Sequence, residues 1–130
     1  MSHKNHPHFD RAGVEHLIQT YFDGLYDGDA DKLASVFAPS SSLTWVHEGQ
    51  LKTLSRDAWL EVVRARPSPR SRGLARDDGI LVLDHAGVDT ALVKVKCQIP
   101  PLYFTDYLSL LRTSGHWQIV QKVYAAVTQI

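Results

Sequence analysis

Residues 14–29 read VEHLIQTYFDGLYDGD, and the apolar side chains in this stretch recur at the spacing of an α-helix. They are Val14, Leu17, Ile18, Tyr21, Phe22, Leu25 and Tyr26, which form one continuous face. Asp10 stands where a helix N-cap is expected, and Gly28 can adopt the left-handed conformation that ends a helix. We therefore expect a helix over residues 11–27.

The next segments predict a second helix, which forms a hairpin with the first. After it, the spacing of the apolar residues changes from that of a helix to that of a strand. Asp29 can cap a second, shorter helix, whose apolar stripe comprises Leu33, Val36 and Phe37 and which Pro39 interrupts. Residues 43–47, LTWVH, alternate with a period of two, and residues 51–54 follow a turn as a return strand. A β-hairpin is therefore expected after the two helices.

A third helix and a four-stranded sheet complete the pattern. Ser55 can cap the helix, which must end before Pro67 because the residue ahead of a proline resists helical geometry. A loop is expected over residues 67–79, followed by strand-like runs at 80–85, 90–98, 103–112 and 117–127. Short gaps between these runs require antiparallel pairing. The sequence thus predicts an α+β fold in which three N-terminal helices pack on an antiparallel sheet.

Composition limits the class of protein. The 130 residues suffice for one domain, which we expect over residues 10–130 after a loosely ordered tail at residues 1–9. Lysine plus arginine and aspartate plus glutamate number 14 each, so net charge does not favour nucleic acid as a partner. Membrane binding is not expected either, because no apolar run approaches the ~20 residues of a span. The single cysteine, Cys97, excludes an internal disulfide and favours a cytoplasmic location.

Asp106 is the first candidate site residue, because it interrupts an apolar row on the strand at residues 103–112. Alternation places it on one face with Phe104, Leu108 and Leu110. A carboxyl group in such surroundings would have a raised pKa and could donate its proton to a ligand. If Arg112 or a lysine reached it, Asp106 would instead be ionised and belong to a structural ion pair.

Aromatic residues and a histidine supply the other candidates. Tyr21 lies in the middle of the helix face, where its hydroxyl needs a polar partner and could donate to a ligand, although a core role is also open. Trp45 and His47 share a strand face, and His47 could act as acid or base or could simply meet solvent beside Glu48. Trp59 is compatible with a core, an interface or a pocket wall.

Several other features do not indicate chemistry. Arginines crowd residues 64–76, where they could grip an acidic ligand group but are more typical of a solvated loop. The tail histidines His3, His6 and His8 lack the ligand spacing of a metal site, and Cys97 is interpreted as a small buried hydrophobe. Because the sequence also lacks nucleotide and zinc motifs, we expect no cofactor and no metal.

Two parts of the sequence, near its beginning and near its end, resemble proteins of the nuclear transport factor 2-like superfamily. The first comprises YFDGLYDGD at residues 21–29 and the LTW strand at 43–45, and the second comprises FTDYLSLL at 104–111 and GHWQIV at 115–120. The second resembles the lumazine-binding subgroup in particular, and the likeness extends from about residue 10 onward. It implies a cone-shaped α+β barrel with a strongly curved sheet, a pocket in the open cone and pairing of two copies through the sheet.

Ketosteroid isomerases within this superfamily carry an oxyanion hole made of a tyrosine and a protonated aspartic acid, a well-known arrangement. By the resemblance, Tyr21 and Asp106 occupy these two places. The position of the isomerase base falls at Trp45, whose indole cannot abstract a proton, and His47 two residues later could substitute.

The leading hypothesis is therefore a homodimer that binds a small organic molecule in a hydrophobic pocket. The pocket would be lined by Tyr21, Trp45, His47, Trp59, Phe104 and Asp106. One alternative is an isomerase, cyclase or dehydratase acting on a polycyclic or carbonyl compound, with Tyr21, Asp106 and His47 as catalytic residues. Another is a protein-interaction module that uses its exposed sheet.

Overall fold

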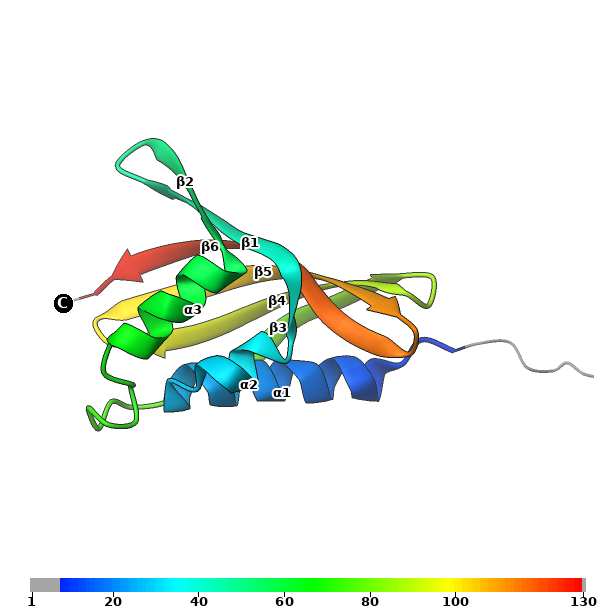
Figure 1. The fold of residues 1–130 in the computed structure, drawn as a ribbon, viewed down its shortest axis with the longest axis horizontal. Helices are drawn as coiled ribbons and strands as arrows, with labels where there is room; N and C mark the ends of the chain where they lie inside the picture. The colour runs from blue at the N-terminus through cyan, green and yellow to red at the C-terminus, as the bar shows by residue number, and fades with distance from the viewer. Residues whose placement is uncertain (1–7, 130) are drawn as a thin grey trace, which may run out of the picture.

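Three helices and a six-stranded sheet make up the fold in the computed structural model, which describes residues 8–129 (Figure 1). The helices are α1 (Arg11–Asp27), α2 (Ala30–Ala34) and α3 (Arg56–Ala65). The strands are β1 (Phe37–His47), β2 (Gln50–Ser55), β3 (Gly79–Ala86), β4 (Thr90–Ile99), β5 (Leu102–Thr113) and β6 (His116–Thr128).

The helices begin where the sequence predicted them to begin, because each has a polar cap. The side chains of Asp10, Asp29 and Ser55 accept hydrogen bonds from the backbone N–H three residues later, at 2.9, 3.0 and 3.1 Å. Gly28 ends α1 with a φ of 64°, the left-handed conformation that glycine adopts without strain. These caps position the two-helix hairpin of α1 and α2 below the sheet in Figure 1.

The sheet has the strand order β2-β1-β6-β5-β4-β3 and curves without closing. Strands β3 to β6 form the antiparallel meander that the sequence predicted. One pair departs from that pattern, since β1 lies parallel to β6, with Phe37 opposite Ile119 and Leu43 opposite Lys122. The N-terminal part of β1 is therefore held by the last strand of the chain.

The second helix is shorter than its apolar stripe predicts. It ends at Ala34, and Val36 accepts a hydrogen bond from the N–H of Ile119 at 2.8 Å, so the chain is already joining the sheet there. Strand β1 then extends through Pro39 as far as His47. Its pairing with β6 is interrupted between Phe37 and Ser42, which accommodates the missing N–H of Pro39.

The core lies between the helices and the concave face of the sheet. Fully buried side chains there come from α1, α2 and the central strands, among them Ile18, Leu33, Phe37, Leu108 and Ile119. Phe9, just ahead of α1, stacks on His85 with ring centroids 3.9 Å apart. None of the helices within residues 8–129 is both long and apolar enough to cross a membrane.

Candidate functional site

Asp106 lies in the middle of β5, opposite Val95 of β4 and Tyr124 of β6. The alternation of the strand turns its side chain toward the helices, and it is completely buried. A carboxylate in this position needs partners, because an isolated buried charge is very costly. The neighbouring elements provide them for Oδ2, whereas Oδ1 has no hydrogen-bond partner among the described residues.

Tyr21 of α1 is the first of these partners. Its hydroxyl donates a hydrogen bond to Oδ2 of Asp106 at 2.6 Å, and its ring is fully buried against Phe22 and Phe37. Burial raises the pKa of the Tyr21 phenol well above its ordinary value, and the charge of Asp106 adds to that rise. The phenol therefore keeps its proton and donates a hydrogen bond to the carboxyl group of Asp106.

Lys122 of β6 is the second partner, and it supplies the opposite charge. Its Nζ lies 3.7 Å from Oδ2 of Asp106, and the residue is 6% exposed. The same Nζ stands over three aromatic rings, at 5.0 Å from the centroids of Trp59 and Tyr124 and 5.3 Å from that of Tyr21. These rings compensate part of the hydration that the buried ammonium group loses.

A pocket opens directly above this cluster. The cavity has a volume of about 80 Å³. It is bounded by α1, α3, the loop after α3, and strands β1, β4, β5 and β6. Its lining residues are Phe22, Leu25, Tyr26, Leu43, Trp59, Arg66, Pro69, Arg76, Asp77, Asp78, Cys97, Gln98, Ile99, Phe104, Lys122 and Tyr124. The wall is mainly aromatic and aliphatic, with a few charged groups, as is usual for sites that take small organic molecules.

Cys97 belongs to both the pocket wall and the buried cluster. Its Sγ lies 3.6 Å from Oδ2 of Asp106, to which it donates a weak hydrogen bond. Burial, followed by the charge of Asp106, raises the pKa of the Cys97 thiol well above its ordinary range. The thiol is therefore held in its unreactive, protonated form.

The arginine-rich loop is tied to α1 at the rim of the pocket. Arg70 binds Asp27 at 2.7 Å, while Arg76 binds Asp23 and Asp78, each at 2.7 Å. The guanidinium groups of both arginines also lie over the ring of Tyr26. This part of the loop is thus tied to the helix beside it, while Arg70 and Arg76 remain exposed, as expected for a solvated loop.

The structure brings together four of the six side chains proposed from the sequence. Tyr21 and Asp106 bind each other beneath the pocket, and Trp59 and Phe104 line it. Trp45 reaches the pocket indirectly, by stacking on Tyr124 with ring centroids 5.3 Å apart.

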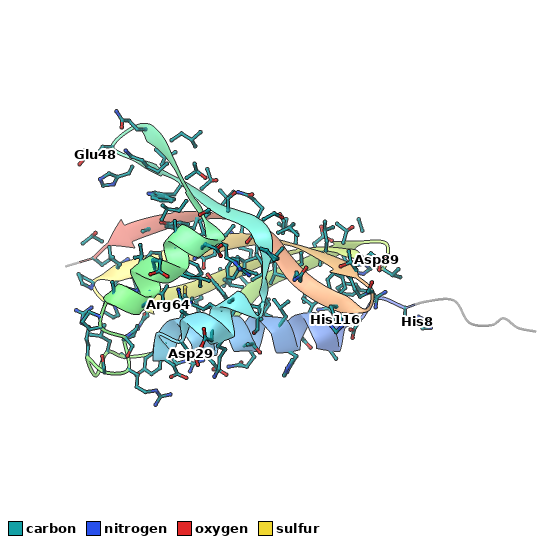
Figure 2. The ribbon with its side chains drawn as sticks, in the orientation of Figure 1. His8, Asp29, Glu48, Arg64, Asp89 and His116 are labelled. Carbon is teal, nitrogen blue, oxygen red and sulfur yellow. The ribbon has the colours of Figure 1, made fainter. Side chains whose placement is uncertain are left out.

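His47 lies apart from this group. Its side chain is 65% exposed, and its Nε2 is 3.5 Å from Oε1 of Glu48. Figure 2 shows Glu48 at the tip of the β1–β2 hairpin, which projects away from α1. The exposed strand-end position, one of the two alternatives that the sequence left open, is the one found.

Sequence reasoning missed Lys122 and Tyr124, and it considered Arg66 only as one of the arginines of residues 64–76 that could grip an acidic ligand group. Lys122 escaped notice because Trp117 and Ile119 mark the inward face of β6 at odd positions, which would place residue 122 outward. A β-bulge between the pairs Ser109–Gln121 and Leu110–Ile119 inserts one extra residue and turns Lys122 inward. No signal in the sequence of β6 itself indicates this inward position.

No metal cluster accompanies the site: within residues 8–129, no three His, Cys, Asp or Glu side chains stand close enough to hold an ion. The tail residues His3 and His6 lie outside the described residues, and His8 is exposed.

The chain has clear structural relatives. It superposes on a nuclear transport factor 2-like protein of unknown function from Silicibacter pomeroyi with a TM-score of 0.74 and 27% identity, covering 89% of this chain and 94% of that one. A similar protein from Shewanella baltica gives a TM-score of 0.80 at 20% identity, covering 91% and 94%. A ketosteroid isomerase-like protein from Erwinia carotovora gives 0.71 at 13% identity, covering 93% and 100%.

These likenesses confirm the predicted fold, a helix-covered curved sheet of the nuclear transport factor 2-like and cystatin-like kind. No curated protein matches the chain. The family model described as "Putative lumazine-binding" matches residues 9–125. This chain therefore belongs to the family of that description, within the nuclear transport factor 2-like superfamily.

Proposed function

We propose that this protein binds a small organic molecule in the pocket between α1, α3 and the sheet. The observation that carries the proposal is the pocket wall itself, where the rings of Trp59, Phe104 and Tyr124 surround a space that also receives the charged side chains of Arg66 and Lys122. Apolar walls with a few converging polar groups are typical of ligand sites. Membership of a family described as lumazine-binding supports the same proposal.

In this proposal some of the predicted site residues contact the ligand, and others lie beneath the pocket and support those that do. Trp59 and Phe104 contact the ligand, while Tyr21 and Asp106 lie beneath the pocket and hold Lys122 in place. Trp45 supports the ring of Tyr124 from behind. His47 has no part in binding, because it is exposed on the hairpin.

The geometry favours binding over the isomerase-like alternative. An oxyanion hole requires two donors directed at the ligand. Here the Tyr21 hydroxyl already donates to Oδ2 of Asp106, and neither residue lines the pocket. A base on the first strand would have to be His47, which faces solvent.

We also propose that the protein acts as a homodimer in the cytoplasm. The convex face of the sheet carries exposed apolar side chains that a second copy would cover, and the one cysteine is a free thiol, as a reducing compartment would keep it.

Blocking the pocket tests the proposed binding function. Ile99 lines the pocket and is only half buried, so Ile99→Trp should fill ligand space without replacing a core residue. A mixture of one- and two-ring aromatic compounds would be screened by ligand-observed NMR. We expect binding to the native chain and at least a roughly tenfold loss of affinity in Ile99→Trp, because the ligand loses the space it occupied.

Leu81→Trp is the matched control, because Leu81 is 49% exposed on β3 and does not line the pocket. This variant should bind like the native chain. Equal affinity in both tryptophan variants would show that the compounds bind elsewhere and would refute the proposal.

A further inference from the structure

All but one of the charged side chains that line the pocket within residues 8–129 have an ion-pair partner. Arg76 is matched by Asp23 and Asp78, and Asp77 is matched by Lys96 at 3.2 Å. Lys122 has Asp106. Of the charged residues that line the pocket within residues 8–129, Arg66 alone forms no ion pair.

Arg66 follows the last turn of α3 and precedes Pro67. The proline forces it out of helical geometry, and its φ and ψ of −96° and 150° are extended. Its side chain lines the pocket, and its Nε is buried with no hydrogen-bond partner among the described residues. Burial lowers the pKa of the Arg66 guanidinium, and the nearby phenols Tyr21 and Tyr124 oppose that shift.

A buried donor without an acceptor is unfavourable, and buried polar groups in folded proteins almost always have partners. Arg66 is a charged donor, so its best partner is an anion. A guanidinium group is planar and presents parallel N–H groups that match a carboxylate in shape as well as charge.

Lys122 adds a second cation to the same pocket. Its Nζ is 3.7 Å from the nearest oxygen of Asp106, beyond hydrogen-bond distance, and it remains available to donate to a ligand. Tyr124 links the two cations, because Nζ of Lys122 lies over its ring and Arg66 is close enough to influence its pKa. Of the two, Lys122 has Asp106 as its counter-charge, whereas Arg66 has no carboxylate partner among the described residues.

We propose that the ligand is an aromatic monocarboxylate, with its carboxylate bound by Arg66 and flanked by Lys122, and its ring system held among Trp59, Phe104 and Tyr124. This inference rests on the proposed binding function and adds the chemical class of the ligand. Arg66, the lining cation without a carboxylate partner among the described residues, can bind one carboxylate group, and the three rings match a flat apolar body.

Matched pairs of acid and amide test this inference. Naphthalene-2-carboxylate and benzoate would be compared with naphthalene-2-carboxamide and benzamide by isothermal titration calorimetry at pH 7. Each pair has nearly the same shape and differs in charge. We expect at least one acid to bind about 10- to 100-fold more tightly than its amide, the range that a hydrogen bond to a charged group provides.

Variants then locate the effect. Arg66→Gln keeps a polar side chain but removes the charge, and it should reduce the acid's advantage over the amide to within about threefold. Arg72→Gln is the matched control, because Arg72 is an exposed arginine of the same loop that does not line the pocket. It should leave the preference unchanged, and circular dichroism would verify that both variants are folded.

The outcomes separate this inference from the proposed function. If the amides bind as tightly as the acids, and Ile99→Trp abolishes the binding of both, then the pocket binds ligands but does not select anions. The proposed function then stands and the inference about the ligand's charge is wrong. If the acid preference survives in Arg66→Gln, Arg66 is not the carboxylate site and the inference is also wrong. If no member of either pair binds while other aromatic compounds do, the ligand class is wrong and the binding function stands. Absence of any binding in the pocket would overturn both.

Discussion

Asp106 and Lys122 form a buried ion pair, and the two residues should therefore be strongly coupled energetically. Asp106→Leu leaves the ammonium group buried without its counter-charge, and Lys122→Met does the same to the carboxylate. We expect each single change to lower the free energy of unfolding by about 3–5 kcal/mol. The double variant should lose far less than the sum, because neither charge remains buried alone.

Urea denaturation of the four proteins in this cycle measures the coupling. The control is the cycle on Lys96 and Asp77, whose side chains are 47% and 59% exposed. Water screens that pair, and its coupling should stay below about 1 kcal/mol. Additive losses at Asp106 and Lys122 would mean that the two charges do not depend on each other.

The same pair shows how far single residues can be interpreted from sequence. Asp106 was recognisable because a charge interrupts an apolar row on a regular strand, and the structure places it at the centre of the buried cluster. Its partner was not recognisable, because the bulge in β6 reverses the alternation between Ile119 and Lys122. A bulge depends on pairing with β5, so the sequence of β6 alone does not reveal which way Lys122 points.

At the scale of elements, the packing of α1 on α2 depends on a glycine. A Cβ atom added at Gly24 would lie 2.8 Å from both Cγ and Cδ2 of Leu33, and Leu33 is completely buried and has no space to move. Gly24→Ala should therefore lower the free energy of unfolding by about 1–3 kcal/mol through overpacking. Chemical denaturation checks this. Higher stability, which the helix propensity of alanine alone would give, would contradict the close approach.

Helix boundaries that depend on neighbouring residues could be predicted from the sequence. Strand pairings that depend on residues far away in the chain could not. The N-caps Asp10, Asp29 and Ser55 act within three residues, and all three helices begin where these residues indicated. The parallel pairing of β1 with β6 joins Phe37 to Ile119, which are far apart in the chain, and nothing near residue 37 indicates it. That distant pairing also explains why Val36 and Phe37 leave the helix despite their helical spacing.

At the scale of the whole molecule, the candidate site exists only once the fold is complete. Tyr21 and Asp106 meet across 85 residues of sequence, and the pocket above them is bounded by α1, α3 and four strands. The resemblance of two sequence segments to a known superfamily anticipated the meeting of Tyr21 with Asp106. It could not anticipate Arg66 or Lys122, whose positions follow from Pro67 and from the bulge in this particular chain.

The convex face of the sheet has no cover within the described residues, and this predicts the assembly state. Exposed apolar side chains gather there on three adjacent strands: Leu92 on β4, Tyr107 and Leu111 on β5, and Val123 and Val127 on β6. The register places Tyr107 beside Val123, so these residues form one continuous surface. Such a surface favours self-association about a two-fold axis, since each copy offers the other the same apolar patch.

We therefore expect a homodimer at micromolar concentration, measured by light scattering coupled to size-exclusion chromatography. Val123→Lys places a charge in the middle of the convex surface, beside Tyr107 in the register. Burying an unpaired charge in an apolar interface is unfavourable, so the dimer should weaken at least about tenfold. Val62→Lys is the control, because Val62 is 45% exposed on α3, away from the convex face, and should leave the dimer intact. A monomeric mass for the native chain, or a dimer that Val123→Lys leaves unchanged, would show that two copies do not meet through the sheet.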